Sequence, residues 1–182
     1  MTRAVVNIIK KIVLLGDPAV GKTSLIQRYV LNEFSDDYIP TIGTKVTKKT
    51  LPMEFEPKRP QSIALSMLIF DVLGQLKYHD MQRPYFQGAE GALIICDLSR
   101  AETIRSLREW NQQLARVVGT VPIIYIGNKK DLIDKDHENK ELLGAIAAEK
   151  DLTYLTTSAR TSDNVERAFE MLARKIIDTN PL

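Results

Sequence analysis

The sequence predicts an α/β fold in which a mostly parallel six-stranded sheet, with one antiparallel edge strand, carries helices on both faces. Short apolar runs rich in Ile, Val and Leu alternate along the chain with amphipathic segments. Buried parallel strands have this appearance because both of their faces are covered, and their crossovers are helices. A glycine-rich loop also follows the first apolar run, which is the order strand, loop, helix.

In chain order, the apolar runs predict parallel strands over residues 8–15, 63–71, 91–97, 121–127 and 152–156. Most of these runs are bounded by Gly, Asp or Asn, which favour turns. Residues 43–50, GTKVTKKT, predict one further strand, and its lysines and threonines suit the edge of the sheet.

The segments between the apolar runs predict helices over residues 22–32, 78–87, 102–118, 138–150 and 163–178. In the third of these, Ile104, Leu107 and Leu114 recur at the spacing of one helix face. In sheets of this kind, ligands bind beyond the carboxyl ends of the strands.

Composition limits the class of protein. A chain of 182 residues with 44% hydrophobic residues is expected to fold as a single domain over residues 1–182. Its net charge of +2 gives no electrostatic reason to bind nucleic acid. The single cysteine, Cys96, excludes an intrachain disulfide, and its apolar surroundings predict a buried thiol in a reducing compartment.

The N-terminal apolar run is interrupted by Asn7, Lys10 and Lys11, so it suits a strand better than a signal peptide or a membrane span. We therefore expect a cytoplasmic protein. No glycine follows Met1 for myristoylation, and the ending DTNPL holds no cysteine for prenylation. Membrane contact is expected only through a partner or through residues missing here.

The stretch GDPAVGKT satisfies the pattern G-x-x-x-x-G-K-[ST] with Gly16, Gly21, Lys22 and Thr23. Between a predicted strand and a predicted helix, this pattern indicates a phosphate-binding loop. Backbone amides and the helix N-terminus favour an anion, the Lys22 ammonium reaches the terminal phosphates, and the Thr23 hydroxyl is a ligand for Mg²⁺. The alternative is a simple strand-to-helix turn capped by a threonine.

The tetrapeptide NKKD, residues 128–131, follows the predicted strand VPIIYIG. Alone, it could be a solvated turn. The Asp131 carboxylate, however, can accept two parallel hydrogen bonds from the ring N–H and the exocyclic amine of guanine, whereas adenine offers an acceptor and a C–H there. A site of this kind discriminates by roughly 10⁴ or more.

Together, the motifs resemble the small GTPases of the Ras superfamily over essentially the whole chain. The resemblance rests on GDPAVGKT (16–23), the threonine of YIPTIGT, DVLGQ (71–75), NKKD (128–131) and TSAR (157–160), in this order. PTIG and NVERAFEMLARKI look most like the Rab branch. The resemblance implies a P-loop NTPase fold (a G domain) and a GTP/GDP switch that depends on Mg²⁺.

The family's roles carry over to matching positions. Thr41 and Asp71 would join Thr23 around Mg²⁺, and the amides of Thr41 and Gly74 would sense the γ-phosphate. Phe34, Lys129 and Arg160 would surround the base, although Phe34 by itself would be taken for a core aromatic. The nucleotide contacts that the resemblance implies are Ala19, Val20, Gly21, Lys22, Thr23, Ser24, Phe34, Tyr38, Thr41, Gly74, Asn128, Lys129, Asp131, Ser158, Ala159 and Arg160.

Hydrolysis is assigned to Gln75, which would orient the attacking water. Residues 35–44 hold no arginine that could act in cis, so we expect a slow rate, on the order of 10⁻⁴ to 10⁻³ per second by analogy with Ras-type enzymes. The resemblance also implies that a GTPase-activating protein, an exchange factor and an effector dock on the switch loops. We expect the protein itself to be a monomer.

The sequence departs from the family's pattern at several places. Pro18 lacks an N–H, so the loop must draw its amides from later positions, and Leu73 and Leu76 make the second switch more apolar. Arg160 replaces a lysine, and residues 51–63 predict a long, proline-rich loop. Two alternatives stay open: a GTP-binding module with little hydrolysis, and a P-loop nucleotide kinase.

Overall fold

A six-stranded sheet forms the middle layer of the molecule, in the order β2-β3-β1-β4-β5-β6. The computed structural model describes residues 5–37, 41, 43–53, 62–73 and 79–179. The strands are β1 (Val5–Leu15), β2 (Lys45–Met53), β3 (Ser62–Asp71), β4 (Gly91–Asp97), β5 (Ile123–Asn128) and β6 (Thr153–Thr156). All neighbouring pairs are parallel except β2 and β3, so the expected sheet and its antiparallel edge strand are confirmed.

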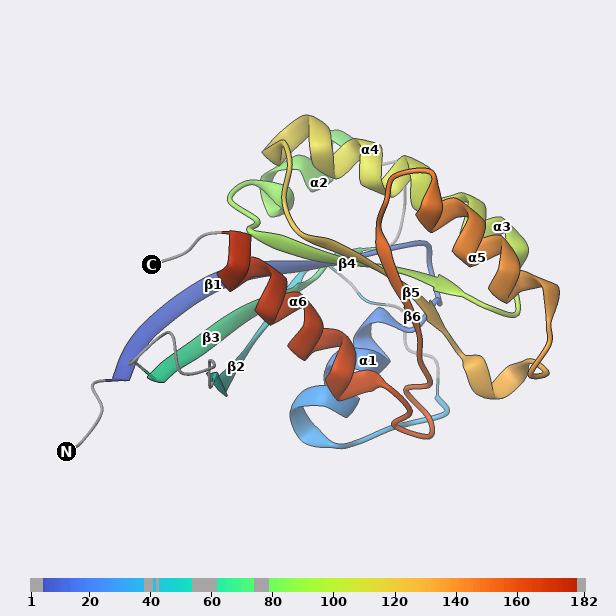
Figure 1. The fold of residues 1–182 in the computed structure, drawn as a ribbon, viewed down its shortest axis with the longest axis horizontal. Helices are drawn as coiled ribbons and strands as arrows, with labels where there is room; N and C mark the ends of the chain where they lie inside the picture. Colours follow the sequence, from blue (N-terminus) through green and yellow to red (C-terminus); the bar gives the residue numbers. More distant parts are fainter. Residues whose placement is uncertain (1–4, 38–40, 42, 54–61, 74–78, 180–182) are drawn as a thin grey trace.

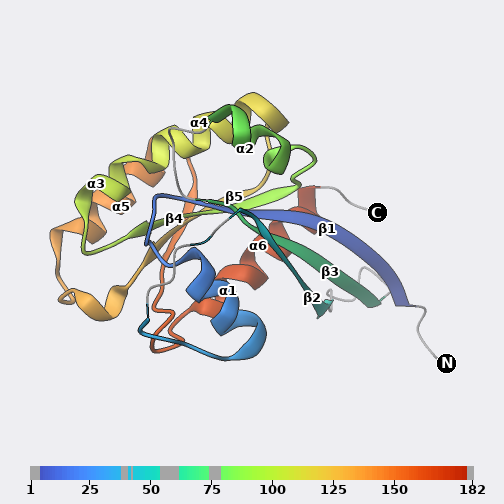
Figure 2. The same ribbon diagram turned by 180° about the vertical axis from the view of Figure 1, so that it is seen from behind.

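Helices cover both faces of this sheet (Figure 1). One face carries α1 (Lys22–Leu31) and α6 (Val165–Thr179). The other carries α2 (His79–Phe86), α3 (Ala101–Arg105), α4 (Leu107–Val118) and α5 (Glu138–Ala148), as the view from behind in Figure 2 also shows. A short 3₁₀ helix, η2 (Lys130–Leu132), follows β5.

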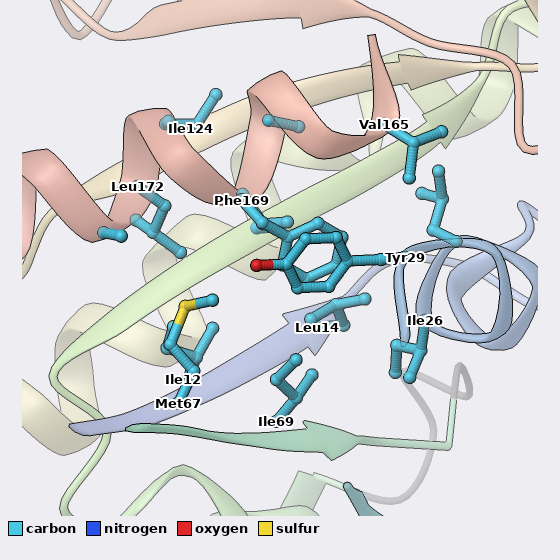
Figure 3. Close-up of a cluster of buried hydrophobic side chains, with 14 of the residues drawn as sticks. Ile12, Leu14, Ile26, Tyr29, Met67, Ile69, Ile124, Val165, Phe169 and Leu172 are labelled. Carbon is cyan, nitrogen blue, oxygen red and sulfur yellow. The ribbon is translucent and has the colours of Figure 1, made fainter. Parts of the chain in front are cut away.

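Alternate residues of β1 feed two separate hydrophobic cores. Ile12 and Leu14 point toward α1 and α6, where Tyr29 lies flat against Phe169 with ring centroids 4.0 Å apart (Figure 3). Val13 and Leu15 belong to the opposite core, with the aromatic rings and aliphatic chains of α2 to α5. This division follows from the two-residue period of a strand, and it explains why the run is apolar throughout.

The first strand is longer than its apolar pattern predicts. It begins at Val5 rather than residue 8, because β1 and β3 pair in register from Val5 opposite Ser62 onward. Along this extension the side chains of Val5 and Ile9 are 58% and 61% exposed. Both ribbon views show this part of β1, with β2 and β3, reaching beyond the helices (Figures 1 and 2). Backbone pairing with β3 therefore determines where β1 begins, and burial of its side chains does not.

The single helix expected over residues 102–118 is two helices that meet at Ser106. The Ser106 hydroxyl donates to the Glu102 carbonyl at 3.1 Å. Such a side-chain bond competes with the main-chain bonds of a helix. Main-chain bonds from Ser106 N–H to Glu102 O and from Trp110 N–H to Ser106 O, both 3.1 Å long, continue the helical pattern on either side of the joint. The expected helical segment is therefore present, but it is divided into two helices at Ser106.

Two other expectations meet different outcomes. Cys96 is fully buried, as predicted, and its thiol faces the Ile126 carbonyl at 3.4 Å. The region 51–63 is only partly a loop, because β2 continues to Met53 and β3 begins at Ser62, and residues 54–61 lie outside the described residues. A projecting surface there stays a prediction.

In the part of the chain that is described, no helix has the length and apolar character needed to span a membrane.

Candidate functional site

A cleft of about 480 Å³ opens at the carboxyl ends of the parallel strands. The glycine-rich loop lines one end of it and the NKKD segment lines the other, although the two are more than a hundred residues apart in the chain. The predicted site residues that line the cleft are Ala19, Gly21, Lys22, Thr23, Ser24, Phe34, Thr41, Asn128, Lys129, Asp131, Ala159 and Arg160. The strand topology brings these residues together, as expected for this class of sheet.

The two motif glycines of the loop are required by close packing. A Cβ atom at Gly16 would lie 2.1 Å from the Ile95 carbonyl oxygen, and one at Gly21 would lie 2.3 Å from the Asn128 amide nitrogen. Both residues also have positive φ, 139° and 99°, which L side chains rarely adopt. The spacing of the motif therefore reflects how tightly the loop wraps under β4 and β5.

Lys22 lies at the floor of this loop with its side chain almost fully buried. Its ammonium donates to the carbonyls of Gly16 at 2.7 Å and Asp17 at 2.9 Å. Burial lowers the pKa of Lys22 to about 8, against the opposing effects of Asp71 and Asp17. A cation held this way in a loop at a helix N-terminus is well placed to bind an anion.

The three residues expected around Mg²⁺ lie together. The Thr23 hydroxyl is 2.9 Å from the Thr41 hydroxyl and donates to Asp71 Oδ2 at 2.5 Å. The other carboxylate oxygen, Asp71 Oδ1, is buried and has no hydrogen-bond partner among the described residues. Burial raises the pKa of Asp71, and the Thr23 bond and the Lys22 charge only partly offset it. An unsatisfied carboxylate oxygen beside two hydroxyls is a donor set that fits a hard, oxygen-preferring cation.

Asn128 joins the two ends of the cleft. Its amide nitrogen donates to the Val20 carbonyl at 2.9 Å, and its amide oxygen accepts from the Thr157 hydroxyl at 3.1 Å and the Ala159 N–H at 3.3 Å. The side chain is 1% exposed. One residue therefore sets the phosphate loop, the NKKD segment and the TSAR segment relative to one another.

Asp131 is held in place by its neighbour from the TSAR segment. The Ser158 hydroxyl donates to Asp131 Oδ1 at 2.5 Å, while Ser158 itself is buried. Asp131 remains exposed at the cleft, so its carboxylate can accept hydrogen bonds from a ligand. A carboxylate that is oriented from behind and open to the cleft can accept the two hydrogen bonds that the sequence analysis expects from guanine.

The other residues expected at the base also gather at this end. Phe34 is half-buried, with the Arg28 guanidinium carbon 5.9 Å from its ring centre. Lys129 has the left-handed backbone conformation, with φ of 61°, and its ammonium pairs with Asp97 at 2.7 Å. Arg160 lies 3.6 Å from Asp36, and both side chains are largely exposed, so this pair contributes little to stability.

Several predicted residues do not line the cleft. Val20 is fully buried in the core, so any contact would come from its backbone. Ser158 and Asp71 are also buried, and they contact the lining residues Asp131 and Thr23 from beneath. Tyr38, Gly74 and Gln75 lie outside the described residues, and their roles stay predictions.

The structure adds residues that the sequence analysis did not assign. Arg28 donates to the carbonyls of Ala159 at 2.8 Å and Arg160 at 3.0 Å, so it ties α1 to the TSAR segment. Asp97, at the end of β4, holds Lys129 and Arg100. An acidic residue that closes a fully apolar strand was a signal that could have identified Asp97. Arg28 gave no such signal, because arginine is common on helix surfaces.

Trp110 also contributes to the loop from a distance. Trp110 belongs to α4 and is almost fully buried, and its indole N–H donates to Asp17 Oδ1 at 2.8 Å. A separate open groove runs along α3 and α4, and it is lined by none of the predicted site residues. The chemistry therefore concentrates at the carboxyl ends of the strands.

Comparisons with known proteins agree with this geometry. Residues 11–178 match the sequence model of the Ras family. The chain is 35% identical to "Ras-related protein RABA4b" of Arabidopsis thaliana over 175 residues, which cover 96% of this chain and 75% of that protein. It is 34% identical to "GTP-binding protein ypt5" of Schizosaccharomyces pombe (94% and 80% covered) and 33% identical to "Ras-related protein Rab-25" of Homo sapiens (93% and 77% covered).

Proposed function

The chain belongs to the Ras family, and from this membership we propose how its own residues perform the work of a guanine-nucleotide switch. It is a Rab-like small GTPase that binds GTP and GDP and hydrolyses GTP in trafficking or signalling. The assignment of individual residues below is our proposal, and it rests on the geometry of the cleft.

The observation that carries the proposal is the convergence of Lys22 and Asp131 in one cleft. Lys22, with the amides from Ala19 to Ser24, binds the phosphates at one end. Asp131 accepts two hydrogen bonds from guanine at the other end, and Ser158 keeps its carboxylate oriented. A fixed separation between an anion site and a base site selects a purine nucleotide with phosphates, and the carboxylate selects guanine.

Thr23 and Asp71 are the residues that would hold Mg²⁺, with Thr41 joining them in the GTP state. When bound, the ion supplies charge neutralisation at the phosphates. The described residues contain no cluster of three or more His, Cys, Asp or Glu, so hydroxyls, one carboxylate and the nucleotide itself would complete the oxygen shell. The unsatisfied Asp71 Oδ1 supports this assignment.

Thr41 and Gly74 would report the γ-phosphate, and Gln75 would orient the attacking water. The hydroxyl of Thr41 lies 2.9 Å from that of Thr23, so a small movement of Thr41 would bring its own hydroxyl and amide to the ligand. Because residues 35–44 contain no arginine, a GTPase-activating protein would have to supply one for fast hydrolysis. Exchange factors and effectors would bind the same switch segments. We further propose that residues 1–182 form one domain that acts as a monomer in the cytoplasm.

Nucleotide titration tests the proposal. With Mg²⁺ present, we expect the purified protein to bind GDP and GTP at micromolar concentration or below and to prefer them to ADP and ATP by roughly 10⁴ or more. Asp131→Asn should lose most of this preference, because the amide cannot accept both hydrogen bonds. Asp136→Asn, an exposed aspartate of the same loop, is the matched control and should keep it. A guanine preference that survives in Asp131→Asn would refute the role of Asp131.

A further inference from the structure

Asp97 is a buried carboxylate on which several segments of the site converge. It is the last residue of β4, and its side chain is 2% exposed. Oδ1 accepts from the backbone N–H of Ser99 at 2.9 Å and from the Ser99 hydroxyl at 2.6 Å. Oδ2 accepts from the Lys129 ammonium at 2.7 Å and from the Arg100 Nε at 3.1 Å. All of its hydrogen-bonding capacity is directed at these groups.

The two cations that share Oδ2 belong to opposite ends of the cleft. Lys129 is part of the NKKD segment at the base end. Arg100 extends toward the phosphate end, where its NH2 group donates to the Pro18 carbonyl at 3.0 Å. A single carboxylate oxygen therefore links the two loops through one side chain on each side.

The electrostatics favour a permanent charge at this position. Burial by itself would raise the pKa of Asp97, but hydrogen bonds from Lys129 and Ser99 outweigh burial and leave it below the ordinary value. Without the carboxylate, the ammonium of Lys129 and the guanidinium of Arg100 would face each other as like charges. Both loops would then lose a restraint at the same time.

Pro18 gives the link a particular use in this chain. It is an exposed residue of the phosphate loop and has no N–H with which to bind a phosphate or a neighbouring carbonyl. The next residue, Ala19, has φ of 60°, a backbone conformation that costs roughly 1 kcal/mol or more for a residue other than glycine. The hydrogen bond from Arg100 to the Pro18 carbonyl can therefore restrain this part of the phosphate loop.

We propose that Asp97 is a positioning residue that couples the phosphate loop to the base-recognition loop, so that nucleotide leaves only when both loops open together. The proposal rests on the function proposed above. Asp97 does not touch the ligand in this scheme. It acts through Lys129 and Arg100, and its removal should speed the release of nucleotide.

The test is the dissociation rate of fluorescently labelled GDP in the presence of Mg²⁺. Asp97→Asn should release GDP roughly tenfold faster or more, because the pair of loops loses its shared anion. Arg100→Ala, at a side chain that is 36% exposed, should release GDP about fivefold faster with an unchanged melting temperature. Because this second variant alters only the exposed end of the link, it decides the matter even if Asp97→Asn fails to fold.

A double variant separates coupling from a general weakening of the fold. If Arg100 acts through Asp97, the combination Asp97→Asn with Arg100→Ala should release GDP within about twofold of Asp97→Asn alone. Rates that multiply independently would contradict the coupling. Asp163→Asn is the matched control: Asp163 pairs with Lys130 of the same NKKD segment at 2.5 Å, but this pair is about 40% exposed and belongs to no link with the phosphate loop. Its rate should stay within about twofold of the unaltered protein.

The outcomes also distinguish this inference from the function on which it rests. Failure of the unaltered protein to bind GDP would overturn the proposed function and the coupling with it. Normal binding, with unchanged release in Asp97→Asn and Arg100→Ala, would overturn the coupling alone. Equal acceleration by Asp163→Asn would do the same, because any ion pair near the loop would then have the same effect.

Discussion

At the scale of single residues, Lys22 and Asp71 show how the fold prepares a site for charge. Both are buried, at 7% and 1% exposure, and burial is the main influence on the pKa of each. It lowers the pKa of the lysine and raises that of the aspartate, so the charged form of each is disfavoured. Phosphates beside Lys22 and a cation beside Asp71 would supply the counter-charges. Without such ligands, the buried charges of the site lower the stability of the folded protein.

This instability should appear as a pH dependence of the nucleotide-free protein. Because the pKa of Lys22 falls from 10.5 to about 8 on folding, the unfolded chain binds more protons between these values, and stability must rise with pH there. The full effect is at most about 3 kcal/mol. We expect urea unfolding to show this rise between pH 8 and 9.5, and Lys22→Met to lack most of it.

Lys150→Met, at an exposed position, serves as the control and should keep the slope of the unaltered protein. Identical slopes in the unaltered protein and Lys22→Met would show that the lysine is not held in the buried, disfavoured state. Lys22→Met should also lose nucleotide binding, since the only buried ammonium in the described part of the cleft is removed.

At the scale of elements, the contact between α1 and α6 connects the phosphate loop to the C-terminal helix. Tyr29 of α1 stacks on Phe169 of α6 (Figure 3), with an angle of 3° between the rings. The ammonium of Lys49 from β2 lies 5.1 Å from the centre of the Tyr29 ring. The Tyr29 hydroxyl, however, is buried and has no hydrogen-bond partner among the described residues. Burial of that hydroxyl raises the pKa of Tyr29, as expected for a group that is held neutral.

Removal of the Tyr29 hydroxyl should therefore stabilise the protein. Tyr29→Phe keeps the ring stack and eliminates a buried polar group without a partner, so we expect the free energy of unfolding to increase by about 1 kcal/mol. Tyr125→Phe is the matched comparison, because the Asn111 amide donates to the Tyr125 hydroxyl at 2.8 Å.

That second variant should destabilise the protein by about 1 kcal/mol, since the Asn111 amide loses its acceptor. Chemical denaturation of both variants measures the two changes. Loss of stability in Tyr29→Phe would mean that the hydroxyl has a partner outside the described residues.

At the scale of the whole molecule, the cleft is assembled from the two halves of the chain. The phosphate loop follows β1, while NKKD and TSAR follow β5 and β6, and β4 lies between them in the sheet. Asn128, Asp97 and Arg28 tie these segments together. A ligand that bridges the cleft must therefore stabilise the entire fold, because neither half can hold it alone.

GDP and Mg²⁺ should accordingly raise the melting temperature cooperatively. A ligand present at 100 times its dissociation constant adds about 2.7 kcal/mol to the free energy of unfolding. We expect chelation of Mg²⁺ to remove part of this stabilisation. Asp71→Asn should keep the shift caused by GDP alone and lose the part that depends on Mg²⁺, which differential scanning fluorimetry would detect. An undiminished Mg²⁺ effect in Asp71→Asn would remove that residue from the metal site.

The sequence alone determined the order of the elements, the phosphate loop and the place of the NKKD segment after a strand, because each depends on local spacing. The α/β sheet, its edge strand and the contribution of Lys22 and Asp131 to one cleft were all predictable from apolar periodicity and short motifs. The start of β1 at Val5 was not predictable, because pairing with β3 extends the strand beyond its apolar pattern. The division of the 102–118 segment into two helices at Ser106 was not predictable either, because the side-chain hydrogen bond found there leaves no periodic signal in the sequence.

Only the tertiary structure decided which residues support the site from behind. The sequence analysis assigned neither Asp97 nor Arg28, and the importance of these residues comes from partners 32 and more than 130 positions away. Such contacts have no period and no fixed spacing, since they depend on which strand ends the sheet places next to one another. Local sequence carries the chemistry of the ligand contacts, whereas the packing of distant segments sets how firmly those contacts are held.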